Sequence, residues 1–268
     1  MSDLKLTETL EYRLLNAWPS LECQFYEGWA ARFADKYTKR ANSASPICPD
    51  AALDDALIEY ISEQYIAVGQ SPIFRLTGLE KAGTDELLAA KGFVEKDPSY
   101  CMLHSDLSQF ETEDSITISS ELTEEWLASS LKSQEKTEET VNITRSIVSR
   151  IRQNHGFATL VMDDQPVAWG LGVIERGYIG LYDVVVQPDL RGLGLGKRVL
   201  CGLMAWGRER GAQHAYLQVT EANEIARSLY ASIGFTDAYR YHYRLKELEV
   251  AVVDDEEAAA EKSLPLVG

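Results

Sequence analysis

A glycine-rich segment in the second half of the chain has the composition of an anion-binding loop. Residues 184–196, VVVQPDLRGLGLG, run from an apolar stretch into three glycines within five positions. Glycine lets the backbone turn tightly and approach an anion, and the start of a following helix offers unpaired N–H groups and a positive dipole end. Arg191, Lys197 and Arg198 add formal positive charge. The segment therefore predicts a site for a phosphorylated ligand.

The spacing of the glycines excludes two common nucleotide motifs. A dinucleotide fingerprint requires Gly-x-Gly-x-x-Gly, and a Walker A loop requires Ser or Thr directly after its lysine. Here the loop reads Arg191-x-x-Gly194-x-Gly196, and Lys197 is followed by Arg198. Neither motif fits this loop.

A second motif follows within about one strand and one helix. Residues 215–220, AYLQVT, have strand composition. Asn223, Ala226 and Tyr230 then recur at helical spacing before a Gly234-Phe dipeptide. The two motifs together cover roughly residues 178–245.

This pair of motifs resembles the two signatures of the GNAT superfamily of acyl-CoA-dependent N-acetyltransferases. The resemblance implies an α/β (α+β) fold in which helices flank a mixed, mostly antiparallel central sheet. It also implies acetyl-CoA as acyl donor, direct transfer of the acetyl group to an amine, and no metal. The residues expected to contact the donor are Val184, Val185, Val186, Arg191, Gly192, Leu193, Gly194, Leu195, Gly196, Lys197, Arg198, Asn223, Ala226 and Arg227.

Tyr230 matches the position of the family's general acid. A phenol has a pKa of about 10 and a thiol about 8.5, so a tyrosine held close to the departing thiolate can protonate it as charge develops. The alternative is an ordinary helix tyrosine that packs its ring.

The sequence offers two candidates for the general base, Asp183 and Glu221. A base that acts through a water molecule is the third possibility. Tyr182 and Asp183 point to opposite faces if their strand alternates regularly. In the family the base tends to lie on the same side of this strand as Tyr182. Asp183 is therefore equally open to a structural role.

Composition places the chain among globular proteins. Its 268 residues are 45% apolar, enough for one large domain or two ordinary ones. The formal net charge of −16 argues against a nucleic-acid partner and favours cationic or neutral acceptors. The four cysteines are scattered, which predicts neither a disulfide framework nor a metal site. With no apolar run long enough to span a membrane, we expect a cytoplasmic protein. A monomer and a homodimer are both open, depending on whether the first half covers the face that dimeric relatives use for self-association.

The order of elements predicts a duplicated architecture. Residues 72–104 read as strand, short helix, Gly-Phe and strand, and residues 216–243 repeat that order. The first copy lacks the glycine loop and has Leu88 or a neighbour at the place of Tyr230, as in the degenerate first repeat of two-domain GNATs such as mycothiol synthase. We therefore expect three regions, joined by a linker at 109–115: a degenerate GNAT-like domain at 1–108, a catalytic domain at 115–250 and an acidic, disordered tail at 251–268.

Further elements follow from periodicity in each half. A helix is expected over residues 138–153, followed by a hairpin over residues 157–174. Residues 28–32 and 37–43 predict two paired strands around a turn at Asp35, and they resemble a "GW-x-x-R … T-x-RANS" element of some bacterial tandem GNATs. That element is either an exposed edge strand or a surface that faces substrate.

Three functions fit the motifs. The first is acetyl transfer from acetyl-CoA to the primary amine of a small molecule. The second is transfer to a protein N-terminus or lysine. The third is an acyl-CoA-binding sensor without catalysis, which would have no need of a proton donor at Tyr230.

Overall fold

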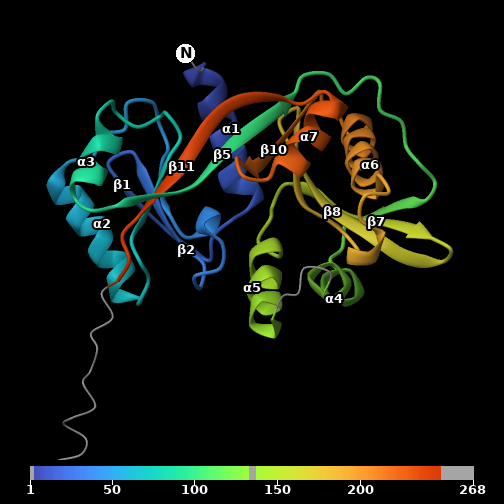
Figure 1. Ribbon diagram of the computed structural model, residues 1–268, viewed down its shortest axis with the longest axis horizontal. Coiled ribbons are helices and arrows are strands. Elements are labelled where there is room, and N and C mark those ends of the chain that lie inside the picture. Colours follow the sequence, from blue (N-terminus) through green and yellow to red (C-terminus); the bar gives the residue numbers. More distant parts are fainter. Residues whose placement is uncertain (1–2, 133–136, 249–268) are drawn as a thin grey trace, which may run out of the picture.

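The computed structural model describes residues 3–132 and 137–248, which build a continuous sheet of eleven strands flanked by helices (Figure 1). The first half of the chain contributes α1 (Leu4–Ala17), β1 (Glu22–Tyr26), β2 (Trp29–Phe33), η1 (Lys39–Ala41), β3 (Ala44–Pro46), α2 (Asp55–Ala67), β4 (Ile73–Leu76), α3 (Thr84–Ala90) and β5 (Val94–His104). The second half contributes β6 (Ile116–Ser119), α4 (Glu124–Lys132), α5 (Glu138–Val148), β7 (Asn154–Met162), β8 (Gln165–Glu175), β9 (Tyr178–Val186), η2 (Pro188–Leu190), α6 (Leu195–Glu209), β10 (His214–Thr220), α7 (Glu224–Ile233) and β11 (Thr236–Leu245). The predicted mixed α/β fold is confirmed, and the predicted tail at 251–268 lies outside the described residues.

The two halves exchange strands in the middle of the sheet. The strand order is β1-β2-β3-β4-β11-β5-β10-β9-β8-β7-β6. The last strand of the chain, β11, lies between β4 and β5 of the first half, and β5 in turn pairs with β10 of the second half. Pairing is antiparallel except between β3 and β4 and between β9 and β10, as the predicted mostly antiparallel sheet requires.

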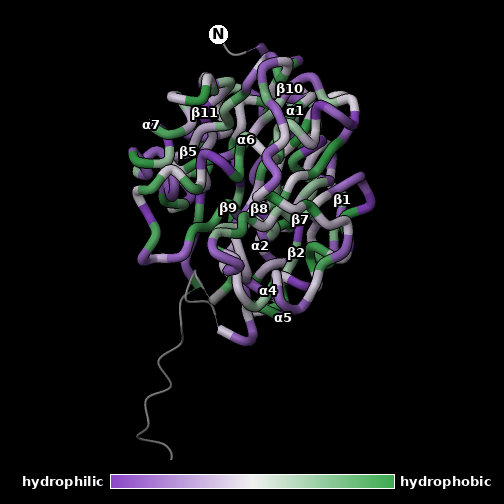
Figure 2. The backbone as a smooth tube through the Cα atoms, turned by 90° about the vertical axis from the view of Figure 1, so that its right-hand side faces the viewer, coloured by the Kyte–Doolittle hydropathy of each residue, from purple (hydrophilic) through white to green (hydrophobic). Residues whose placement is uncertain are grey.

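Alternation along the strands divides the interior between the two faces of the sheet. On β8, Val173 packs into the core that contains residues of α1, α4 and α5, whereas Ile174 packs into the core below α6. The apolar face of α6 supplies Val199, Leu203 and Trp206 to that second core. A side view coloured by hydropathy shows hydrophobic residues, in green, recurring along the strands and helices (Figure 2). A third core under α2 belongs to the first half.

The predicted strand over residues 37–43 is wrong. β2 pairs with β1 and β3 instead, and residues 39–41 form the single turn η1. The side chain of Asn42 accepts a hydrogen bond from the N–H of Ala34 at 2.7 Å and donates to the carbonyl of Tyr37 at 2.7 Å. The polar side chains that suggested an edge strand therefore satisfy the backbone of a loop.

Helix α5 is shorter than the helix predicted over residues 138–153. It ends at Val148, and β7 begins at Asn154. Ile151, which extends the helical spacing, is buried in the irregular segment between them. Burial of an apolar residue therefore continued the helical pattern beyond the helix itself.

Candidate active site

Strands β9 and β10 diverge in the middle of the sheet. They pair in parallel only over residues 178–180 and 214–216. Beyond that point β9 pairs with β8 and β10 pairs with β5, each through its outer edge. We call the gap between residues 181–186 and 217–220 the wedge. Its two facing backbone edges are available to an extended ligand, because neither is used in pairing among the described residues.

A β-bulge bends β9 at the wedge. The register against β8 shifts by one residue between Tyr182 and Val185, and Asp183 has a φ of 46°. Burial and then the nearby charge of Asp183 raise the pKa of Tyr37, which packs against the same core as Tyr182. The bulge interrupts the regular alternation on which the expected opposite directions of Tyr182 and Asp183 depend.

The glycine loop leads from β9 into the start of α6. Gly192 and Gly194 have φ values of 82° and 77°, a region that glycine enters without strain. No side chain caps the helix at Gly194. The backbone N–H groups of residues 192–197 donate no hydrogen bond to any described residue. This row of free donors at a helix N-terminus fits the pyrophosphate that the loop motif predicts.

The basic side chains of the loop have different surroundings. Arg191 and Lys197 are exposed, and the Nε of Arg191 lies 3.5 Å from the carbonyl oxygen of Val186. The guanidinium of Arg198 instead donates to Glu113 at 2.9 Å and to Ser115 at 2.8 Å. A contact between Arg198 and a phosphate would therefore compete with this ion pair.

The spacing of the second motif has a local cause in α7. The side chain of Asn223 accepts a hydrogen bond from the N–H of Ala226 at 3.0 Å and so caps the helix. Arg227, one residue later, lies 4.2 Å from the ring centroid of Tyr100 and 3.2 Å from the carboxylate of Asp237.

Tyr230 lies on α7 with its ring packed against Phe235, at a centroid distance of 6.2 Å. It contacts the core that also contains Val184 and Val186 of the wedge. Burial raises the pKa of Tyr230. Because its hydroxyl has no hydrogen-bond partner among the described residues, the proton is available to a ligand. Both properties suit a proton donor and leave the predicted role untested.

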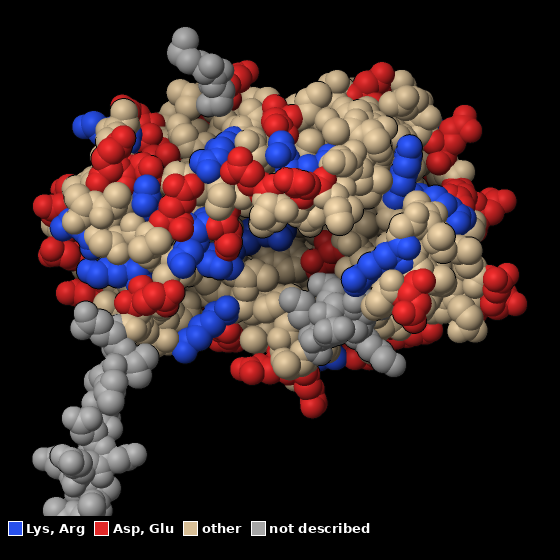
Figure 3. Space-filling model, viewed as in Figure 1, with Lys and Arg blue, Asp and Glu red and all other residues tan. Residues whose placement is uncertain are grey.

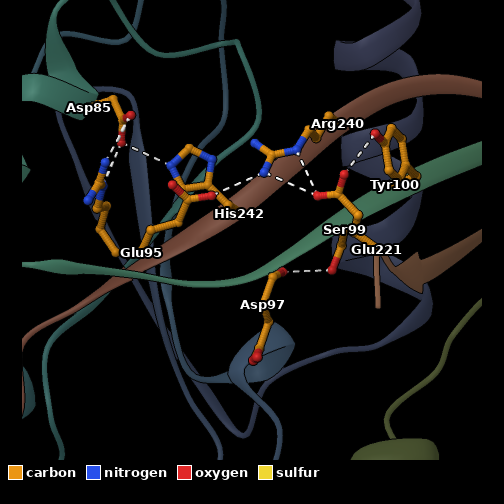
Figure 4. Close-up of polar contacts among 9 residues, drawn as sticks. Asp85, Glu95, Asp97, Ser99, Tyr100, Glu221, Arg240 and His242 are labelled. Carbon is orange, nitrogen blue, oxygen red and sulfur yellow. Dashed lines mark hydrogen bonds and ion pairs between the residues drawn. The ribbon is translucent and has the colours of Figure 1, made fainter. Parts of the chain in front are cut away.

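Glu221 follows β10 at the open end of the wedge. Figure 4 shows its carboxylate between Tyr100, whose hydroxyl donates at 3.3 Å, and Arg240, whose guanidinium donates at 3.3 Å. Arg240 also binds Glu95 at 3.1 Å. A role as general base would have to compete with these contacts. Asp183, the other candidate, lies at the bulge.

Three residues near the wedge, Trp18, Tyr216 and Gln218, were not singled out from the sequence, and their contact with Tyr182 or their burial was not expected. The hydroxyl of Tyr182 donates to that of Tyr216 at 3.2 Å, and the ring of Trp18 stacks on Tyr182 at a centroid distance of 6.1 Å. Two residues after Tyr216, the amide of Gln218 is buried without a partner among the described residues. These residues come from three distant segments, so no local spacing could have linked them.

A hollow opens between the two halves on the face drawn in Figure 3. Basic side chains reach into it from the side of the first half. Within the described ranges, no group of three or more potential metal ligands occurs. The same residues contain no helix that is long and apolar enough to cross a membrane.

Comparisons with known proteins identify similar sequences that are named acetyltransferases. Residues 7–244 match the family model described as "Probable histone acetyltransferase Rv0428c C-terminal". The uncharacterized N-acetyltransferase YobR of Bacillus subtilis is 26% identical over 252 residues, which cover 92% of this chain and 100% of that protein. Mycothiol acetyltransferase of Thermobispora bispora is 46% identical over 61 residues, or 22% of this chain and 21% of that protein.

A solved structure shares the fold over almost the whole chain. The GCN5-related N-acetyltransferase from Kribbella flavida superposes with a TM-score of 0.64 at 16% sequence identity, covering 92% of this chain and 97% of that one. Because the matched family model also spans most of the sequence, the chain belongs to the GNAT superfamily of N-acetyltransferases, in the family described by that model.

Proposed function

We propose that the protein transfers the acetyl group of acetyl-CoA directly to the primary amine of a small molecule. The observation that carries this proposal is the row of unpaired N–H donors at residues 192–197, which continues from the open backbone edge of β9. An extended thioester arm in the wedge and a pyrophosphate at the start of α6 would use these two features together.

The chemistry needs a proton donor on one side and a proton acceptor on the other. Attack by the neutral amine forms a carbon–nitrogen bond, and the carbon–sulfur bond breaks. Tyr230 would give its proton to the sulfur. Asp183, at the bulge, would take the proton of the amine directly or through water, and Glu221 is the second candidate.

The covering of the wedge supports a small acceptor. Trp18 of the first half stacks on Tyr182, and Tyr37 interacts with Thr144 of α5. Residues of the first half and α5 therefore meet on the side of the sheet opposite α6. A substrate that approached the wedge from this side would lie against both, which favours a compact molecule.

A thiol-release assay with acetyl-CoA and a panel of primary amines tests this function. Tyr230→Phe should lower turnover by at least an order of magnitude, because one general acid is lost, while the dissociation constant of acetyl-CoA stays near that of the wild type. Calorimetry measures that constant separately. If turnover were unchanged, Tyr230 would be a packing residue; if the wild type released no thiol with any amine, the sensor would be the better proposal.

The description of the family as a probable histone acetyltransferase supports a second candidate, transfer to a protein amine. Peptides with free N-termini or lysines belong in the same assay. Preference for long peptides over small amines would favour this candidate.

A further inference from the structure

Arg40 presents a positive charge to the wedge from the first half. The carbon at the centre of its guanidinium lies 5.4 Å from the ring centroid of Trp18 and 5.8 Å from that of Tyr182. The side chain is half-buried, and within the described residues it forms no ion pair and donates no hydrogen bond. A partly buried guanidinium beside two stacked aromatic rings is suited to bind a planar anion through two parallel hydrogen bonds.

Two buried side chains fix the backbone that carries Arg40. Arg32 is 3% exposed, and its guanidinium donates to the carbonyl of Arg40 at 2.7 Å and also to that of Trp18. Asn42, 2% exposed, holds the preceding turn through the carbonyl of Tyr37 at 2.7 Å. Because the loop is fixed without help from the Arg40 side chain, that side chain is positioned in advance for a ligand.

Two cations of the first half are already neutralised by carboxylates, in contrast to Arg40. Lys39 pairs with Asp97 at 2.7 Å, and Arg75 pairs with the buried carboxylate of Glu11. The charges of Arg40 and Asp183 both act on the phenol of Tyr37, which places a cation and an anion close to the same ring. This arrangement complements a molecule with a positive and a negative end.

We propose that Arg40 binds a carboxylate of the acceptor, so that the acceptor is an amine that also carries a carboxylate, as in an amino acid or a short peptide. The inference rests on the proposed acetyltransferase function and narrows its substrate class. The carboxylate would lie against Arg40, beside the stacked rings of Trp18 and Tyr182, and the amine would lie toward the bulge at Asp183.

Matched pairs of acceptors test this role. Amino acids and dipeptides are supplied as free acids and as the corresponding carboxamides, and thiol release is measured for the wild type and for Arg40→Gln. The wild type should use the acids at least tenfold better, and Arg40→Gln should raise the KM for the acids by about one to two orders of magnitude, the value of a charge-assisted pair. The KM for acetyl-CoA and for the carboxamides should change little.

Lys39→Gln is the matched control, because it removes a neighbouring charge that already has a partner; it should behave like the wild type. Arg40→Lys should recover part of the preference. Equal use of acids and carboxamides by the wild type, or an equal loss of both in Arg40→Gln, would contradict the proposal. Thiol release with only neutral amines would remove the role of Arg40 and leave the acetyltransferase proposal intact, whereas no release with any amine would remove both.

Discussion

Glu11 and Arg75 form an ion pair inside the core that joins the two halves. Their side chains are 2% and 3% exposed, and the hydroxyl of Tyr239 on β11 also binds Glu11. Removal of one partner leaves the other charge buried without compensation. Glu11→Gln should therefore lower the free energy of unfolding by about 3–5 kcal/mol in urea denaturation. Glu8→Gln, which breaks an exposed pair with Lys5, should cost less than about 1 kcal/mol; equal losses would show that the buried pair is not special.

Asp85 makes stability depend on pH. Hydrogen bonding from Arg244, and further from His242, holds the pKa of Asp85 below its usual value despite partial desolvation. The pair therefore stabilises the fold above the unfolded pKa of about 4, and this contribution is lost as the pH falls through the folded pKa. The variant Asp85→Asn lacks this stabilising contribution at every pH. The difference in Tm between wild type and variant should shrink between about pH 6 and pH 3; a constant difference would argue against the linkage.

At the level of single elements, the start of α6 is the part most sensitive to substitution. Gly194→Asp should abolish measurable binding of acetyl-CoA in calorimetry, because a carboxylate would stand beside the unpaired N–H groups. Gly211 is the control: it has a φ of 88° at the other end of α6, and a Cβ there would meet nothing within 4 Å, as at Gly194. Gly211→Asp should bear similar backbone strain but retain binding. Loss of binding in both would point to strain alone.

The sequence predicts the elements that are determined by residues close together in the chain. The glycine loop at 192–196 and the helix that carries Ala226 and Tyr230 are set by residues within a few positions, and both are found where the motifs place them. Helix α1 was not predicted, although the cap at Asp3 and the spacing of Leu10 and Leu14 are local signals. The bulge at Asp183 was not predicted because it depends on how β9 pairs with β8, which residue spacing does not reveal. The position of Arg40 could not be predicted either. It is set by contacts with Arg32 and Trp18, which the spacing of residues in the sequence does not reveal.

For the whole molecule, the exchange of strands predicts that the halves fold only together. Without β11, an isolated fragment of residues 1–108 would leave β4 and β5 without the strand that pairs with both. A fragment of residues 109–248 would lack β5 beside β10. Exposed edges of this kind favour aggregation. Each fragment alone should lack a cooperative thermal transition, and coexpression should restore it; a separately folded fragment would contradict this view.

The continuous sheet shows why the sequence could predict two halves but not how their strands pair. Repeated element order suggested two successive domains, and residues 1–108 and 115–250 remain a proposal for their bounds. Sequence order cannot reveal that β5 and β11 each lie beside strands of the other half, because pairing between distant strands follows from the packed core.

The place of β11 also sets an order of events during synthesis on the ribosome. β4 and β5 are complete at residue 104, yet the strand that lies between them begins at Thr236. A nascent chain must therefore carry two incomplete strand edges while the whole second half is translated. The first half can close its sheet only after translation of β11, so this protein should depend on chaperones that shield β-edges more than an enzyme of the same size with separately folding domains.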